Sequence, residues 1–145
     1  MKKWKSIIVY CSFVALPVIV SNANAHEQSS MMNQKGMHAE KPSLDNLLKS
    51  RLEAVNGTDV IVSRVSIPPN TSLPKHWHPG EEFAYIMEGS VILWQEGKAD
   101  IIGKKGEIVK VPLKQVHTAI TNDEGAVILV FRVHESGKPE RNIVN

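Results

Sequence analysis

The sequence of 145 residues predicts an all-β protein with a single domain, an antiparallel sandwich or barrel. Three observations lead to this prediction. From residue 57 onward the chain is a succession of short runs rich in Val and Ile, turns with Gly, Pro or Asn separate these runs, and helical periodicity is nearly absent. Runs of this length and spacing are typical of antiparallel strands around one core.

The first 25 residues have the pattern of a secretory signal peptide. Three lysines come first, residues 7–20 are mostly apolar, and a small-residue cleavage site ends at Ala25. The apolar run is too short to cross about 30 Å of hydrocarbon as a helix, and Pro17 interrupts it. We therefore expect an exported protein, periplasmic or secreted, that is cleaved near Ala25 and is not held in a membrane.

Loss of this signal would change both the charge and the cysteine content of the chain. It would remove three of the 17 basic residues and none of the 15 acidic ones, which leaves a slightly negative mature protein. No basic run and no alternation of basic and aromatic residues indicates a nucleic-acid partner. The only cysteine, Cys11, lies within the signal, so the mature chain would have neither a disulfide nor a thiolate site.

Two segments precede the barrel. Residues 26–42 are polar and without periodicity, and we expect a flexible leader. Its methionines and histidines would suit copper, although a linker in which they are incidental is the simpler interpretation. Residues 43–57 form an N-terminal arm whose leucines, Leu44, Leu47 and Leu48, have helical spacing, and a short segment or a strand-like arm that packs on the domain fits them.

The barrel is expected to span residues 58–134. Its expected strands are residues 60–67, 76–88, 90–95, 99–102, 107–112, 117–121 and 126–133. Residues 135–145 have no strand or helix pattern, and we expect an irregular C-terminal tail.

The run HWHPGEEFAYIMEG, residues 76–89, is the most informative of these segments. Because side chains alternate along a strand, His76 and His78 share one face. Glu82 lies on the same face if the strand resumes after the Pro-Gly pair. Two imidazoles and a carboxylate on one face suit a divalent metal, and His117 is a further candidate ligand.

These residues carry a resemblance to the cupin superfamily. The first cupin motif reads H-x-H-x3–4-E-x6-G, and His76, His78, Glu82 and Gly89 match it, although the glycine expected before the histidines is missing.

The second cupin motif, G-x5-P-x-G-x2-H-x3-N, is matched by Gly106, Pro112 and His117. The second glycine of the motif is Lys114 in this chain, and its asparagine is Thr121. The resemblance covers roughly residues 58–134 and implies the double-stranded β-helix, or jelly-roll barrel, of the cupins.

The resemblance further implies that His76, His78, Glu82 and His117 bind one divalent transition metal inside the barrel. Four ligands leave one or two positions open on a five- or six-coordinate ion, and an open position is what a catalytic metal site needs. Three His and one Glu accept Fe, Mn, Ni, Cu or Zn, so the ligand set does not identify the metal.

A metal-dependent enzyme acting on a small organic substrate is the function that we expect. Small cupins similar to this chain include dioxygenases, isomerases and lyases. In dioxygenation and in acid–base catalysis alike, Glu82 is the candidate catalytic residue, as metal ligand and as base. The alternative is a non-catalytic module that binds or senses a metal or a small ligand. In a third interpretation the metal is purely structural and stabilises the fold of a small barrel.

Other charged residues have open roles. Arg132 could hold a carboxylate substrate or cap a strand edge, and Lys114 could reach an anion at the barrel mouth or lie in solvent. Glu81 is expected to point away from the metal site, and His134 is expected to be exposed beyond the last strand.

The face opposite the candidate ligands carries Phe83, Tyr85 and Met87. Such an apolar surface on one strand needs a cover, and the core of so short a chain is modest. We therefore expect a homodimer.

Overall fold

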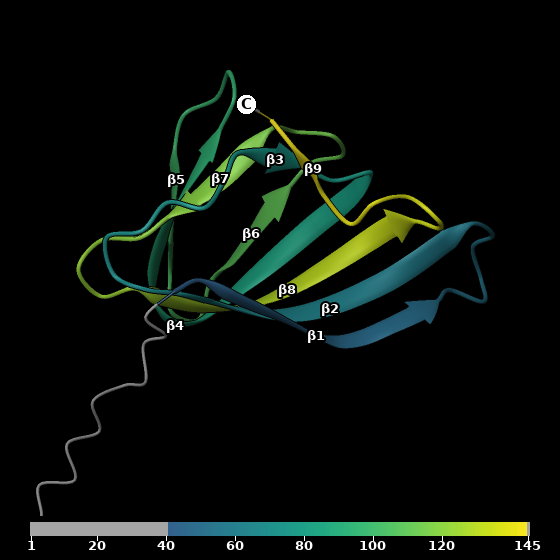
Figure 1. Cartoon of the computed structure of the whole chain (residues 1–145), viewed down its shortest axis with the longest axis horizontal. Coiled ribbons are helices and arrows are strands. Elements are labelled where there is room, and N and C mark those ends of the chain that lie inside the picture. The colour runs from purple at the N-terminus through teal and green to yellow at the C-terminus, as the bar shows by residue number, and fades with distance from the viewer. Residues whose placement is uncertain (1–40, 145) are drawn as a thin grey trace, which may run out of the picture. The chain divides into compact units, whose positions relative to one another are not determined.

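The computed structural model describes residues 41–144, and within this range all regular secondary structure is β (Figure 1). No helix in this part of the chain is long and apolar enough to span a membrane. The predicted signal peptide and all but the last two residues of the predicted leader lie outside the described residues. The strands are β1 (Ser43–Arg51), β2 (Thr58–Ile67), β3 (His76–Trp77), β4 (Gly80–Gln95), β5 (Ile101–Lys104), β6 (Ile108–Val111), β7 (His117–Ile120), β8 (Ala126–Glu135) and β9 (Asn142–Ile143).

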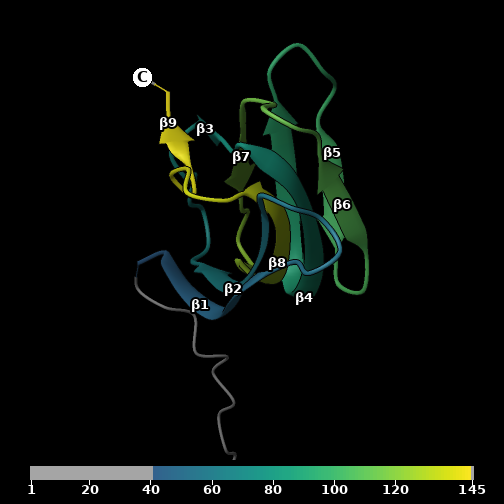
Figure 2. The same ribbon diagram turned by 90° about the vertical axis from the view of Figure 1, so that its right-hand side faces the viewer.

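The strands form one antiparallel sheet that curls over to give two facing layers. The path through the sheet is β1-β2-β8-β4-β7-β3-β9, and β5 and β6 also pair with β4. In Figure 1 the layer with β3, β7 and β9 lies above the layer with β1, β2 and β8, and Figure 2 shows the same two layers after a turn of 90°. The expected all-β double-stranded β-helix is confirmed.

Strand β4 joins the two layers. Its first half pairs with β6 and β8 in one layer, and from Ser90 onward it pairs with β5 and β7 in the other. The sequence predicted two strands separated at Gly89, whereas the backbone continues as a single strand that changes layers there. Gly89 has a φ of +69°, and a Cβ at this position would lie 2.0 Å from the carbonyl oxygen of Gly125. Only glycine fits this bend.

The core lies between the layers because the inward positions of the strands are apolar. On β8, Ala126, Ile128 and Val130 point inward, and on β4 the inward side chains include Ala84 and Ile86, the latter fully buried. This is the alternation that a two-layer β fold requires. The same inward row of β8 continues into Arg132 and His134, so the polar site is an extension of the core face.

Both ends of the described chain belong to the sheet. The expected N-terminal arm is β1, which pairs with β2 along almost its whole length, from Ser43 opposite Ser66 to Arg51 opposite Asp59. Its leucines are spaced as in a helix, but the segment is a strand, and Leu47 is 60% exposed. The expected irregular tail contains β9, which pairs with β3. These ends matter for function because the start of β1 and the residues just before β9 line the cavity described below.

Candidate metal centre

Three histidines converge at one end of the space between the layers. His76 on β3 lies directly opposite His117 on β7 in the antiparallel pairing. His78 follows on the same face as His76, two residues along. The ring centroids are 4.4 to 5.2 Å apart, and one nitrogen from each ring lies within 4.8 Å of the others. All three side chains are buried.

Each of these rings is oriented by a backbone carbonyl that accepts a hydrogen bond from its Nδ1. The partners are the oxygens of Pro74 for His76 at 2.8 Å, of Gln115 for His117 at 2.9 Å, and of Glu140 for His78 at 2.5 Å. A carbonyl only accepts, so the Nδ1 of each ring carries the proton. The Nε2 atoms are thereby presented to one another, and metal-binding histidines are usually oriented in this way.

Glu82 completes the cluster from the start of β4. Its Oε2 lies 2.9 Å from His78 Nε2, and its Oε1 lies 3.9 Å from His117 Nε2. The Nε2 atoms of His76 and His78 are 3.1 Å apart, and His117 Nε2 is buried without a hydrogen-bond partner in the described structure. Several lone pairs therefore face a common point. One nitrogen from each of the three imidazoles lies close enough for one divalent cation to bind all three, and the Glu82 carboxylate is adjacent, so the donor set fits a metal.

Burial and neighbouring groups shift the pKa values of His76, His117 and Glu82 in the direction that favours metal binding. Burial lowers the pKa of His76 to about 4 and also lowers the pKa of His117. Burial alone would raise the pKa of Glu82, but the adjacent His78, together with His117 and Arg132 nearby, holds that pKa below its usual value. The imidazole of His76 is thus neutral near neutral pH, and the shifts at His117 and Glu82 run in the direction that metal ligands require.

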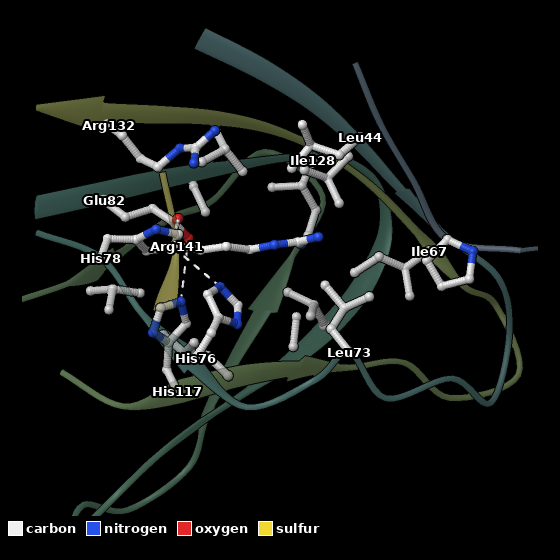
Figure 3. Close-up of a pocket in the computed structure, with 18 of the residues that line it drawn as sticks. Leu44, Ile67, Leu73, His76, His78, Glu82, His117, Ile128, Arg132 and Arg141 are labelled. Atoms are coloured by element: carbon white, nitrogen blue, oxygen red, sulfur yellow. Dashed lines mark hydrogen bonds and ion pairs between the residues drawn. The ribbon is translucent and has the colours of Figure 1, made fainter. Parts of the chain in front are cut away.

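The cluster opens into a cavity of about 490 Å³ between the layers (Figure 3). One end of the cavity is polar, formed by the three histidines, Glu82 and Arg132. Most of the remaining wall is apolar and comes from both layers: Leu44, Val65, Ile67, Leu73, Ala84, Val91, Leu93, Val109, Val111, Ala119, Ile128 and Val130. A volume of this size accommodates a small organic molecule, and an apolar wall with a few convergent polar groups is typical of ligand sites.

The model of the cupin domain family matches residues 63–132, a range that includes all four candidate ligands. Residues 63–132 form a cupin domain. A comparison with curated proteins found no significant sequence match. Among solved structures, the cupin domain and its surroundings are similar to the DMSP lyase DddQ from Ruegeria pomeroyi, with a TM-score of 0.60 and 20% identity over 72% of this chain and 52% of that one.

Two further solved structures are similar to the same extent. A cupin-like protein from Thermotoga maritima has a TM-score of 0.58 and 20% identity, covering 72% of this chain and 76% of its own. The polyketide cyclase RemF from Streptomyces resistomycificus has a TM-score of 0.57 and 22% identity, covering 74% of each chain. Identities this low establish the fold alone. The chain spans about half the length of the DMSP lyase.

The structure brings together all four residues that the sequence proposed as ligands, His76, His78, Glu82 and His117. The break at Pro79-Gly80 preserves the shared face, because Glu82 returns to His78 at 2.9 Å. Their role as metal ligands stays a prediction.

Arg132, whose role the sequence left open, lies inside the cupin domain. It is only 2% exposed, lies opposite Glu82 in the pairing of β4 with β8, and donates to Ser63 Oγ at 2.7 Å. Its guanidinium also lies 3.5 Å from the carboxylate of Glu140. The alternation of the run AVILVFRV places Arg132 on the face of Ile128, and this signal could have assigned it to the interior.

Residues 136–144, the C-terminal segment, take part in the site, although no pattern in the sequence indicated this. Glu140 supplies the carbonyl that orients His78, and its carboxylate also contacts Asn46 at 3.3 Å and Lys49 at 3.5 Å on β1. Burial raises the pKa of Glu140, but hydrogen bonds and charges from Asn46, Arg132 and Lys49 outweigh this and lower it. Glu140 thus ties the segment to both β1 and β8.

Two further expectations from the sequence have different outcomes. Glu81 points away from the cluster as expected and pairs with Lys110 at 2.6 Å. His134 is not exposed: β8 runs on to Glu135, and His134 is 1% exposed, with its Nε2 near the carbonyl oxygen of Lys138 at 3.2 Å. The expectation for His134 was wrong because it ended the strand too early.

The two departures from the second cupin motif have structural substitutes. Lys114, at the glycine position, has a φ of +56°, the left-handed conformation that explains a glycine there, and its side chain is exposed and does not line the cavity. Thr121, at the asparagine position, is buried and donates from Oγ1 to the carbonyl oxygen of Pro68 at 2.6 Å. Thr121 therefore anchors the loop that precedes β3.

Proposed function

We propose that this protein is a metal-dependent enzyme that acts on a small organic substrate. One divalent transition metal would be held by His76, His78, His117 and Glu82. The observation that carries this proposal is the position of the cluster at the polar end of a 490 Å³ cavity, so that a bound ion and an organic molecule would adjoin each other.

The chemistry follows from which side chains adjoin the cavity. When bound, the metal would act as a Lewis acid that polarises a substrate oxygen. Glu82 is the candidate base, because the other carboxylate in the cavity wall, that of Glu140, is engaged by Arg132, Asn46 and Lys49. Its lowered pKa makes Glu82 a weak base, which suits a substrate whose proton is already acidified by a neighbouring carbonyl.

Acid–base chemistry, such as that of an isomerase or lyase, is the reaction class that we favour over dioxygenation. Two of the similar structures are by name a lyase and a cyclase. Dioxygenase-like chemistry at the same ligand set is the alternative within the enzyme proposal. A non-catalytic module that binds or senses a metal or small ligand is the alternative outside it, and the apolar wall of the cavity would serve such a module as well.

The test is to purify the protein after expression of the full chain in metal-replete medium and to measure bound metal by elemental analysis. About one equivalent of a transition metal is expected. Iron, manganese, nickel, copper and zinc remain the candidates. A folded protein without metal would contradict the enzyme proposal. With metal present, turnover of enolisable carbonyl compounds without consumption of oxygen separates acid–base from dioxygenase chemistry.

Export is a second proposal, based on the signal pattern of residues 1–25. We expect the purified protein to begin at His26 and to be found outside the cytoplasm. The intact mass of the same preparation shows whether the chain has been cleaved. Retention of all 145 residues would contradict cleavage near Ala25.

The apolar outer face of the cupin domain supports a homodimer. Phe83 lies opposite Phe131, and Tyr85 opposite both Leu129 and Ile108, on the side of the sheet away from the cavity. Phe131 is 43% and Ile108 67% exposed, a clustered apolar exposure that is unusual for a monomer. A second copy of the chain is the cover that we propose for this face.

The prediction is that Phe131→Glu converts a dimer into a monomer, because a carboxylate would be buried without a partner in the interface. Light scattering during size-exclusion chromatography measures the mass. The matched control is Ile102→Glu, which changes another exposed apolar residue on β5 in the other layer and is expected to leave the mass unchanged. A monomeric parent protein, or a dimer unaffected by Phe131→Glu, would contradict the assignment.

A further inference from the structure

The C-terminal segment places an arginine in the cavity. Arg141 follows Glu140, and its side chain points into the cavity from the side of β9 (Figure 3). Neighbouring contacts fix the backbone at this point. β9 pairs with β3, Val144 donates to the carbonyl oxygen of Lys75 at 2.9 Å, and the carbonyl of Glu140 accepts from His78. Arg141 is therefore held over the site by the same segment that orients a candidate ligand.

Of the charged side chains in the cavity wall, two arginines and two glutamates, Arg141 is the one that no carboxylate pairs with in the described structure. Arg132 and Glu140 form an ion pair with each other, and Glu82 belongs to the histidine cluster. Arg141 has no carboxylate within 4.0 Å among residues 41–144, as the ion pairs of that range show. The guanidinium of Arg141 is therefore available to an anion, and a bound divalent metal would make the wall net positive and strengthen that attraction.

A second unsatisfied group lies nearby. The Nε of Arg132 is buried and has no hydrogen-bond partner in the described structure. Buried donors without partners are rare in folded proteins, and they often mark the place of a ligand or an ordered water. The cavity thus combines one unpaired cation with one unpaired donor.

The rest of the wall limits what the anion can be. It is built mainly from Val, Ile, Leu and Ala side chains of both layers. Such a wall favours a ligand whose main part is apolar and disfavours highly hydrated ions such as free phosphate. A planar guanidinium matches a carboxylate, which it can bind through two parallel hydrogen bonds.

We propose that the cavity binds an organic carboxylate with an apolar body, and that Arg141 recognises the carboxylate. This inference rests on the proposed function in that it names the substrate class of the same site. The ion pair of Arg132 with Glu140 helps to hold the segment that carries Arg141.

The test compares two probes of the same shape and different charge, cyclohexanecarboxylate and cyclohexanecarboxamide. Binding is measured by isothermal titration calorimetry on metal-free protein, so that the acid cannot bind through a metal, and then on metal-loaded protein. We expect the carboxylate to bind the metal-free protein about 10-fold or more tightly than the amide. In Arg141→Gln this preference is lost, while affinity for the amide is unchanged. Arg141→Lys is expected to keep part of the preference for the carboxylate.

Lys138→Gln is the matched control. Lys138 is a cation on the same segment, it lies 3.8 Å from Glu135, and it does not line the cavity, so its loss leaves the preference intact. Arg141 is an exposed residue although it lines the cavity, and we expect the unfolding temperature and metal content of Arg141→Gln to match those of the parent protein.

Three results would overturn the inference: equal affinity for the two probes, a carboxylate preference that survives in Arg141→Gln, or no binding of the carboxylate. These results are independent of the metal proposal. A protein that binds no metal yet discriminates between the probes through Arg141 supports the inference alone, whereas a metal-loaded protein without discrimination supports only the metal centre.

Discussion

Replacing His117 with alanine is expected to lower the affinity for the metal by at least about 100-fold, more than the 10- to 100-fold typical of losing a group that only orients a ligand. His117 is the one candidate ligand on β7, and its Nε2 is buried without a partner in the described structure. Its removal leaves the ligand set without its donor from that strand. The dissociation constant of the purified variant, measured by competition with a chromophoric chelator, gives the result.

His134→Ala is the control for this variant. His134 is as deeply buried as His117, but it lies on β8 and outside the histidine cluster. Both substitutions leave a cavity and lower the free energy of unfolding, whereas only His117→Ala should change the metal affinity. One equivalent of metal bound by His117→Ala with unchanged affinity would refute the ligand assignment.

Thermal unfolding offers a second readout of the same prediction. A ligand that binds only the folded state stabilises it by about 2.7 kcal/mol when its free concentration is 100 times the dissociation constant. The parent protein should therefore unfold at a higher temperature with metal than without it, and His117→Ala should show almost no such difference. His134→Ala should retain the increase.

The four candidate ligands were accessible from the sequence because most of their geometry is local. Alternation along one strand puts His76 and His78 on one face, and the spacing of the motif brings Glu82 back to it. The position of His117 is not local, since it depends on the pairing of β3 with β7, and only the resemblance to cupins indicated it. Short-range periodicity predicts faces, and pairing between distant strands decides which faces meet.

The parts that the sequence did not reveal depend on such distant pairings. The continuity of β4 through Gly89 reflects its partners β6 and β8 on one side and β5 and β7 on the other. The C-terminal segment has too few apolar residues to predict a strand, and its place is set by two pairs with β3 and by the ion pairs of Glu140. Polar contacts of this kind leave no periodic pattern in a sequence.

Assembly of the site requires the bend in β4. The half of β4 before Gly89 carries Glu82, and the half after it pairs with β7, on which His117 lies. If the strand ran straight, the two layers would not face each other, and the carboxylate and the imidazole could not meet. The conformation of one glycine thus connects the fold to the proposed metal centre.

Replacing Gly89 with alanine should therefore be strongly destabilising. The left-handed conformation costs a residue with a Cβ about 1–2 kcal/mol, and at Gly89 the Cβ would also lie 2.0 Å from the carbonyl oxygen of Gly125. The obstacle is backbone, which cannot rotate away as a side chain could. We expect a loss of at least about 3 kcal/mol in the free energy of unfolding, which is a large part of the roughly 5–15 kcal/mol that stabilises a typical domain.

Gly97→Ala isolates the steric part of this effect. Gly97 has a φ of +73°, almost the same as the +69° of Gly89, but a Cβ there would meet nothing within 4 Å. Its substitution should cost only the conformational penalty, about 1–2 kcal/mol. Chemical denaturation of both variants measures the difference. Equal losses of stability would mean that the contact with Gly125 relaxes freely and that the bend does not depend on glycine. A much larger loss at Gly89 would show that the close approach of β4 to the Gly125 turn maintains the two-layer arrangement around the site.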